Sequence, residues 1–101
     1  MAKVIAELVV VPLGTASPSV SSYVAEVEKT LRRFSLEMRL TPMGTILEGD
    51  LGEVLRAVQA AHEVPFTHGA FRVATHLRID ERRDKELTME GKIRAVEEKL
   101  K

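Results

Sequence analysis

Two copies of a Pro-x-Gly-Thr motif contain the residues best suited to binding a ligand. Pro12-Leu13-Gly14-Thr15 closes the first apolar run, and Pro42-Met43-Gly44-Thr45 follows thirty positions later. Proline fixes φ, glycine permits positive φ, and threonine adds a hydroxyl, so each copy predicts a sharp corner at a strand end. Such corners either hold a ligand or only turn the chain. Neither copy is a phosphate-binding loop, because the lysine and the longer glycine spacing of that motif are missing.

The remaining reactive side chains do not form a catalytic or metal-binding pattern. His62, His68 and His76 are six and eight positions apart, not four apart as in a helical metal pair. The chain has no Cys, which excludes thiolate ligands and thiol catalysis. No nucleophile, base and orienting group can be named together, so we expect a protein that is not an enzyme and uses no metal or cofactor.

Composition limits the class of protein further. At 101 residues we expect a single domain, 1–101. Lys plus Arg and Asp plus Glu are 15 each, so the net charge is zero and neither nucleic acid nor an acidic membrane is an expected partner. Oligomerisation would add stability to a domain this small, and a neutral one risks self-association unless its oligomer is specified.

The first apolar run, residues 4–11, is too short to span a membrane and contains Glu7. No small-residue cleavage pattern follows it, so the predicted location is the cytoplasm. The absence of Cys agrees with a reducing compartment. The chain also lacks Asn, has the single Gln59 and is 30% charged, a composition that leans toward a thermophilic source.

Four strands and three helices are predicted from the periodicity. Residues 3–12 are apolar at both odd and even positions, as in a central strand covered on both faces. Residues 36–48 alternate between apolar and polar and predict a hairpin, and 70–79 alternate in the same way and predict a fourth strand. A stripe at helical spacing predicts a first helix over 18–34, which Ser17, Pro18 and Ser19 begin. The charges off this stripe, Glu26, Glu28, Lys29, Arg32 and Arg33, are expected to form a solvated face.

Two more helices complete the pattern. Asp50 and Glu53 predict a reciprocal cap for a second helix that ends near 62–65. Residues 80–84 are expected to cap a third helix, whose apolar stripe is Met89, Ile93, Val96 and Leu100.

The order strand, helix, strand, strand, helix, strand predicts an α+β protein, a ferredoxin-like β-α-β-β-α-β sandwich with a C-terminal third helix. In this arrangement we expect four antiparallel strands with both helices on one face. The first and third strands are expected to be central and parallel, and the two Pro-x-Gly-Thr corners to lie at opposite ends.

The sheet face without helices is predicted to carry charge. Alternation places these residues on it, beside the apolar Ile5, Val9 and Ile46: Glu7, Arg39, Thr41, Glu48, Arg72, His76 and Arg78. If a second subunit buries this face, each charge needs a partner, because losing one partner of a buried pair costs about 3 to 5 kcal/mol. The face is therefore predicted to be either a subunit interface with paired charges or a pocket for a polar ligand.

Longer segments of the chain resemble the small thiamine-binding-protein family, related to the YkoF-type binders of thiamine and hydroxymethylpyrimidine. The resemblance covers nearly the whole chain and is most specific at 41–49, Thr-Pro-Met-Gly-Thr-Ile-x-Glu-Gly. Supporting segments are 11–15, 19–24, 72–75 and 79–84. The resemblance implies a ferredoxin-like fold and subunits that pair edge to edge and stack into a homotetramer, a dimer of dimers. It also implies binding of thiamine or its pyrimidine moiety without catalysis.

Candidate ligand-binding residues follow from what such a heterocycle needs. Glu48 is expected to accept from an exocyclic amine or to oppose a cation, Met43 to give a soft wall, and Gly44 to allow close backbone approach. Hydroxyls are expected from Thr41, Thr45, Ser19 and Ser21. The alternative for Glu48 is an ion pair with Arg39 or Arg72.

A second interpretation of the whole chain stays open. Glu7, Arg39, Arg72 and His76 would then form a charge network or an oligomer interface. The protein would be a structural or regulatory homo-oligomer that binds an anion or no ligand. The chain has no aromatic pair for stacking on a pyrimidine, since aromatic residues make up only 4%.

Overall fold

The computed structural model describes residues 3–17 and 20–101 and has the predicted element order. Its elements are β1 (Lys3–Leu13), α1 (Ser21–Leu31), β2 (Glu37–Thr41), β3 (Gly44–Asp50), α2 (Leu51–Thr67), β4 (Arg72–Glu81) and α3 (Met89–Leu100). The strands form one sheet in the order β2-β3-β1-β4. This is the ferredoxin-like α+β sandwich with a C-terminal third helix, as predicted.

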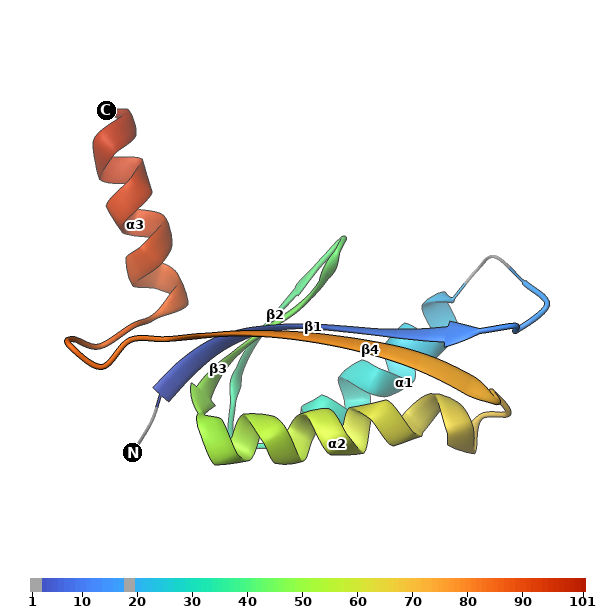
Figure 1. Cartoon of the computed structure of the whole chain (residues 1–101). Coiled ribbons are helices and arrows are strands. Elements are labelled where there is room, and N and C mark those ends of the chain that lie inside the picture. Colours follow the sequence, from blue (N-terminus) through green and yellow to red (C-terminus); the bar gives the residue numbers. More distant parts are fainter. Residues whose placement is uncertain (1–2, 18–19) are drawn as a thin grey trace.

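The sheet has one covered and one open face. Helices α1 and α2 pack on the same side, and α3 stands off the opposite side (Figure 1). All three strand pairings are antiparallel, so the expectation of parallel central strands is wrong. The chain returns through α1 before β2, which makes β2 parallel to β1, and β3 runs back between them.

Strand β1 shows which face holds the core. Val4, Ala6 and Leu8 are at most 2% exposed and face the helices, whereas Ile5 and Glu7 between them are half-buried on the open face. Within one chain β1 is therefore covered on one face only, contrary to the prediction. The buried core that α1, α2 and β3 add to it consists of Val27, Leu31, Leu47, Val54, Ala57, Ala61 and Val64.

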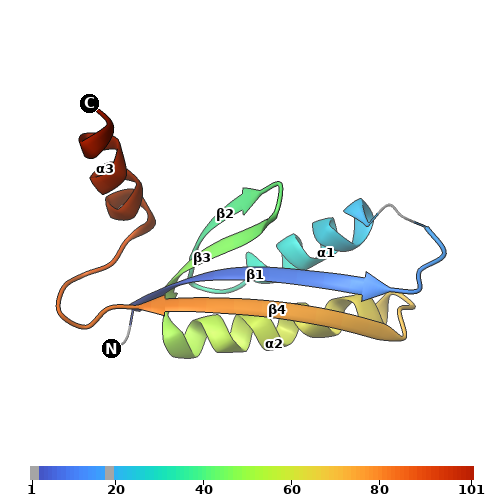
Figure 2. The same ribbon diagram turned by 45° about the horizontal axis from the view of Figure 1, so that its top comes forward.

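The two corners both use glycines with positive φ. Gly14 has φ of 70° and Gly44 has φ of 157°. Both corners lie toward the same end of the sheet, so the prediction of opposite ends is wrong (Figure 2). In an antiparallel pair, the C-terminal end of β1 and the N-terminal end of β3 are at the same side. The hairpin tip is level with the middle of β1, so the first corner lies beyond it.

The helix ends differ from the prediction. α1 begins at Ser21, and its N-cap position is Val20 rather than Ser17; Pro18 and Ser19 lie outside the described residues. It ends at Leu31, one turn earlier than predicted.

Helix α2 starts at the predicted place, because the Asp50 carboxylate accepts a hydrogen bond from the Glu53 N–H at 3.2 Å. The cap is not reciprocal as predicted, since the Glu53 carboxylate bonds the Ser35 N–H and Arg56 instead. The helix runs to Thr67, through Pro65, since this proline falls in the last turn and its carbonyl closes the helix by accepting from Ala70. Helix α3 is capped by Thr88 rather than by residues 80–84, because β4 extends to Glu81.

Candidate functional site

A cleft lies between α1 and the β2–β3 hairpin, and we call it the α1–hairpin cleft. Its inner hollow measures about 210 Å³ and is lined by Leu8, Val9, Val10, Val11, Val20, Val24, Val27, Leu40, Thr41, Pro42, Met43, Gly44 and Thr45. Its outer hollow measures about 890 Å³ and shares Val20, Val24, Leu40, Thr41 and Pro42, to which it adds Ser21, Ala25, Glu28, Lys29 and Arg32. Both parts are mainly apolar, and charged side chains line only the outer one.

Glu28 is the buried acid of this cleft. Only 8% of the residue is exposed, and its Oε1 accepts a hydrogen bond of 2.8 Å from the hydroxyl of Thr45, which is 5% exposed. Its second oxygen, Oε2, is buried and has no hydrogen-bond partner among the described residues. The carboxylate that borders the cleft therefore has one buried oxygen that no described residue satisfies.

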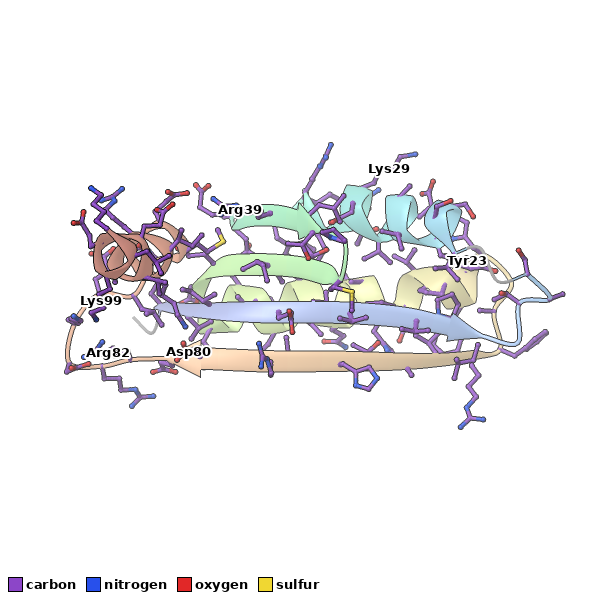
Figure 3. The ribbon with its side chains drawn as sticks, turned by 90° about the horizontal axis from the view of Figure 1, so that it is seen from above. Tyr23, Lys29, Arg39, Asp80, Arg82 and Lys99 are labelled. Carbon is purple, nitrogen blue, oxygen red and sulfur yellow. The ribbon has the colours of Figure 1, made fainter. Side chains whose placement is uncertain are left out.

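The prediction of a solvated face is wrong for Glu28. The residue lies four positions after Val24 and three before Leu31, so it borders the apolar stripe of α1. That spacing was a signal for burial, but the partner came from a strand that is distant in the sequence. Lys29, by contrast, lies on the outer side of α1 as predicted and bonds Glu26 at 3.1 Å (Figure 3).

The hairpin gives the cleft its second wall. The Thr41 hydroxyl donates to the Gly44 carbonyl at 2.7 Å and accepts from the Met43 N–H at 3.2 Å, so it holds the turn together. Met43 is 80% exposed at the tip. Ser21, the first residue of α1, is exposed at the mouth. Five predicted ligand-binding residues thus surround one cleft, while Ser19 lies outside the described residues.

Glu48 lies elsewhere, on the open face. It is three positions after Thr45 on β3, so the alternation of the strand directs the two side chains to opposite faces. Its Oε1 accepts the backbone N–H of Met89 at 2.6 Å, at the start of α3. A carboxylate is favourable there because the helix N-terminus carries partial positive charge. No ion pair joins Glu48 to Arg39 or Arg72 within the described residues.

A groove on the open face separates the sheet from α3. It measures about 550 Å³, and its lining includes Ile5, Glu7, Arg39, Ile46, Arg78, Asp80, Met89, Lys92 and Ile93. Three ion pairs cross or border it: Arg39 with Glu90 at 2.6 Å, Lys92 with Asp80 at 2.5 Å, and Arg78 with Glu7 at 3.6 Å. Figure 3 looks onto this face and shows Arg39 beside the end of α3.

The predicted charge network is not joined within one chain. Glu7 and Arg39 have separate partners, as given above. Arg72 and His76 are exposed on the same face, and neither has a hydrogen bond or ion pair to another described residue.

Exposed ion pairs perturb the ionisable groups at two other places. Hydrogen bonding to Arg82 lowers the pKa of Asp84 in the β4–α3 connection. Hydrogen bonding to Arg56, and then to the Ser35 N–H, lowers the pKa of Glu53 at the start of α2. Both groups are away from the cleft, so their shifts reflect local structure.

Residues 3–17 and 20–101 contain neither a metal-binding cluster nor a membrane-crossing helix. No group of three or more His, Cys, Asp or Glu side chains is placed to hold a metal ion. None of the helices in this part of the chain combines the length and the apolar character that crossing a membrane requires.

The sandwich and its small cleft define a small-molecule-binding protein of the ferredoxin-like class. The chain belongs to the thiamine-binding protein family, whose model matches residues 6–97. It is 48% identical over 100 residues to the UPF0045 protein YqgV of Bacillus subtilis, covering 95% of this chain and 96% of the relative. It is 46% identical over 96 residues to a UPF0045 protein of Methanothermobacter thermautotrophicus, covering 94% and 97%.

Solved structures agree on the fold. The crystal structure of hypothetical protein MJ1052 from Methanocaldococcus jannaschii is similar with a TM-score of 0.89 and 43% identity, over 97% of this chain and 99% of that one. A putative thiamine biosynthesis/salvage protein from Thermotoga maritima is similar with a TM-score of 0.77 over 93% of this chain and 98% of that one. At 19% identity, the second likeness concerns the fold alone.

Proposed function

We propose that the chain binds thiamine, hydroxymethylpyrimidine or a similar small heterocycle in the α1–hairpin cleft, without catalysis, as a carrier, buffer or sensor. The observation that carries the proposal is the cleft itself: an apolar hollow beside the buried Glu28–Thr45 pair. Ligand sites of this kind combine apolar walls with a few placed polar groups. Membership of the thiamine-binding family supports the heterocycle as the ligand.

Each wall of the cleft has a role in this proposal. Valines from β1 and α1 would cover the ring, and Met43 would add an adaptable wall that replaces the missing aromatic pair. Gly44 allows the hairpin backbone to approach β1, with no side chain in between. Thr41, Thr45 and Ser21 provide hydroxyl oxygens around the ring. Because two of these hydroxyls already bond protein groups, most of the ligand affinity is expected from burial of the ring.

The absence of catalysis remains part of the proposal. The hydroxyl–imidazole pair nearest to a catalytic arrangement is Thr75 with His62, at 2.6 Å between Oγ1 and Nδ1. It lies between β4 and α2, on a different part of the sheet from the α1–hairpin cleft. We also propose that the chain works in the cytoplasm as one domain, 1–101, and that its source is thermophilic.

We propose further that the working form is a homotetramer, a dimer of dimers. The open sheet face presents half-buried Ile5, Val9 and Ile46, and the apolar stripe of α3 is exposed, with Ile93 at 45% and Val96 at 58%. Exposed apolar surface that continues from a helix to a sheet is typical of a protein interface. Copies stacked on this face would also surround Arg72 and His76.

Calorimetric titration with thiamine and with hydroxymethylpyrimidine tests the proposed ligand. We expect saturable heat and a rise in the melting temperature, because a ligand that binds only the folded state stabilises it. Neither heat nor thermal shift at millimolar ligand would overturn the proposal. Val24 lines both hollows, so Val24→Phe narrows them and is expected to weaken binding at least tenfold, whereas Leu55→Phe on the exposed side of α2 leaves it unchanged.

The second candidate function is a structural or regulatory oligomer that takes an anion or nothing. The exposed stripe of α3 favours it, because assembly needs no ligand. Loss of the tetramer in Arg72→Ala, together with no ligand binding by the native protein, would support this function over the first.

A further inference from the structure

One oxygen of a buried acid in the cleft has no partner. The Glu28 residue is more than nine-tenths buried, and its Oε1 accepts from Thr45 while Oε2 has no hydrogen bond within the described residues. Leaving a buried carboxylate oxygen unpaired is unfavourable, since its hydration is lost and nothing replaces it. A protein that keeps such a group needs a reason for it.

Nearby cations do not satisfy the carboxylate. Lys29 is the next residue along α1, but its ammonium group bonds Glu26 and points outward. Arg32, one turn further on, lines the outer hollow and has no ion pair with a described residue. The free oxygen of Glu28 is therefore not half of an internal salt bridge.

The position of Glu28 links it to the cleft. The residue lines the outer hollow, and the hydroxyl that bonds its Oε1 belongs to Thr45 in the inner hollow. A ligand that extends from the apolar inner hollow into the outer one would bring its polar edge toward this residue. The Thr45 bond fixes the orientation of the acid before any ligand arrives, which lowers the entropic cost of binding.

We infer that Glu28 anchors the ligand, and that the ligand presents an N–H donor or a positive charge to Oε2 from a flat, largely apolar ring. This inference rests on the proposed function and narrows it to amino-substituted or cationic heterocycles. A carboxylate accepts hydrogen bonds from such donors, and charge makes these bonds stronger than neutral ones. The same charge rejects anionic ligands, so this cleft would not take the anion of the second candidate function.

Selectivity between matched compounds follows from this chemistry. A site with a buried acceptor discriminates strongly against an analogue that lacks the matching donor, because the acceptor then stays unpaired. 4-Amino-5-hydroxymethyl-2-methylpyrimidine and its 4-methyl analogue differ only by replacement of the amino group. We expect the amino compound to bind at least tenfold more tightly to the native protein.

The variant Glu28→Gln tests the anchor in the full-length protein. The side chain keeps its shape and keeps an oxygen for Thr45, but it loses the charge and turns the free acceptor into an amide donor. We expect at least tenfold weaker binding of thiamine and of the aminopyrimidine, with a melting temperature that is unchanged or higher. The control is Glu26→Gln, two positions away with a side chain 37% exposed, which should change affinity less than twofold.

Three outcomes overturn the inference in different ways. Equal binding of the two pyrimidines, or an unchanged affinity in Glu28→Gln, rejects the anchor and leaves the proposed function standing. A lower melting temperature of Glu28→Gln with native affinity assigns the acid a structural role instead. If the native protein binds neither thiamine nor the aminopyrimidine, the proposed function fails and the inference fails with it.

Discussion

Gly44 is the residue on which the hairpin wall of the cleft depends most directly. Its φ is 157°, and a Cβ placed there would lie 3.0 Å from the Leu8 carbonyl oxygen and 3.0 Å from a methyl of Val9. Any larger residue would push the hairpin away from β1. Gly14 in the other corner also has positive φ, 70°, but a Cβ there would meet no atom within 4 Å. The two Pro-x-Gly-Thr motifs are thus alike in sequence, but only the glycine of the second packs closely against β1.

Alanine substitution should separate the two glycines. Gly14→Ala pays mainly for the left-handed backbone, about 1 kcal/mol of unfolding free energy. Gly44→Ala adds the backbone clash, so we expect a loss of about 2 to 3 kcal/mol and weaker ligand binding. Urea denaturation measures the first quantity and titration the second. Equal losses of stability in both variants would contradict this explanation of the hairpin.

Helix α3 is held to the sheet by its first turn. Thr88 caps it by accepting from Gly91, and the Glu48 carboxylate accepts the Met89 N–H. From Gly91 to Leu100 every residue is exposed. A helix of 12 residues is marginal in water without tertiary support, so these few contacts decide its placement.

Glu48→Ala should therefore loosen α3 selectively. A hydrogen bond to a charged acceptor contributes about 1.5 to 3 kcal/mol, and we expect amide protection in α3 to fall while protection in α2 stays the same. Glu90→Ala, which removes the exposed pair with Arg39, should have an effect below about 1 kcal/mol. Hydrogen exchange followed by NMR gives both values. Unchanged protection of α3 in Glu48→Ala would show that Thr88 alone starts the helix.

The molecule as a whole presents a two-layer sandwich with one bare side. Helices α1 and α2 cover one face of the sheet (Figure 1). The other face and the stripe of α3 leave apolar side chains partly or largely exposed. A chain this small buries a modest fraction of its surface, so covering this side with further copies would add stability that the monomer lacks.

Charge on the α3 stripe should therefore break the proposed assembly. We expect Ile93→Glu with Val96→Glu to shift the protein to smaller species in sedimentation velocity at micromolar concentration. The monomer fold should persist, because both positions are already exposed within one chain. Glu98→Lys, on the opposite side of α3, should leave the assembly intact. A native protein that sediments only as a monomer at low concentration would reject the tetramer itself.

Much of the fold was predictable from local patterns. The alternation in 36–48 and 70–79 predicted the strands, and the Asp50 cap predicted the start of α2, because these signals depend on residues close in the chain. Local patterns did not predict the strand directions or the helix ends. The antiparallel pairing of β1 with β3 depends on the path of the chain through α1 and β2. Pro65 does not stop α2 at once, because it lies in the last turn of the helix.

The candidate site divides in the same way. The second Pro-x-Gly-Thr motif predicted a ligand site at the hairpin, and the resemblance in 41–49 indicated the family. The sequence pointed to a different acid. Glu48 belongs to the 41–49 segment, but strand alternation directs it toward α3, and Glu28 of α1 lies beside Thr45 instead. No local pattern joins Glu28 to Thr45, which are 17 positions apart.

By itself the sequence determined the order of the elements, which residues of each strand share a face, and the family. Periodicity and short motifs are properties of neighbouring residues. Only the tertiary structure decided which carboxylate enters the cleft, which face stays bare and where α3 stands. Those outcomes depend on how the antiparallel register brings distant segments together, and on which buried groups then lack a partner.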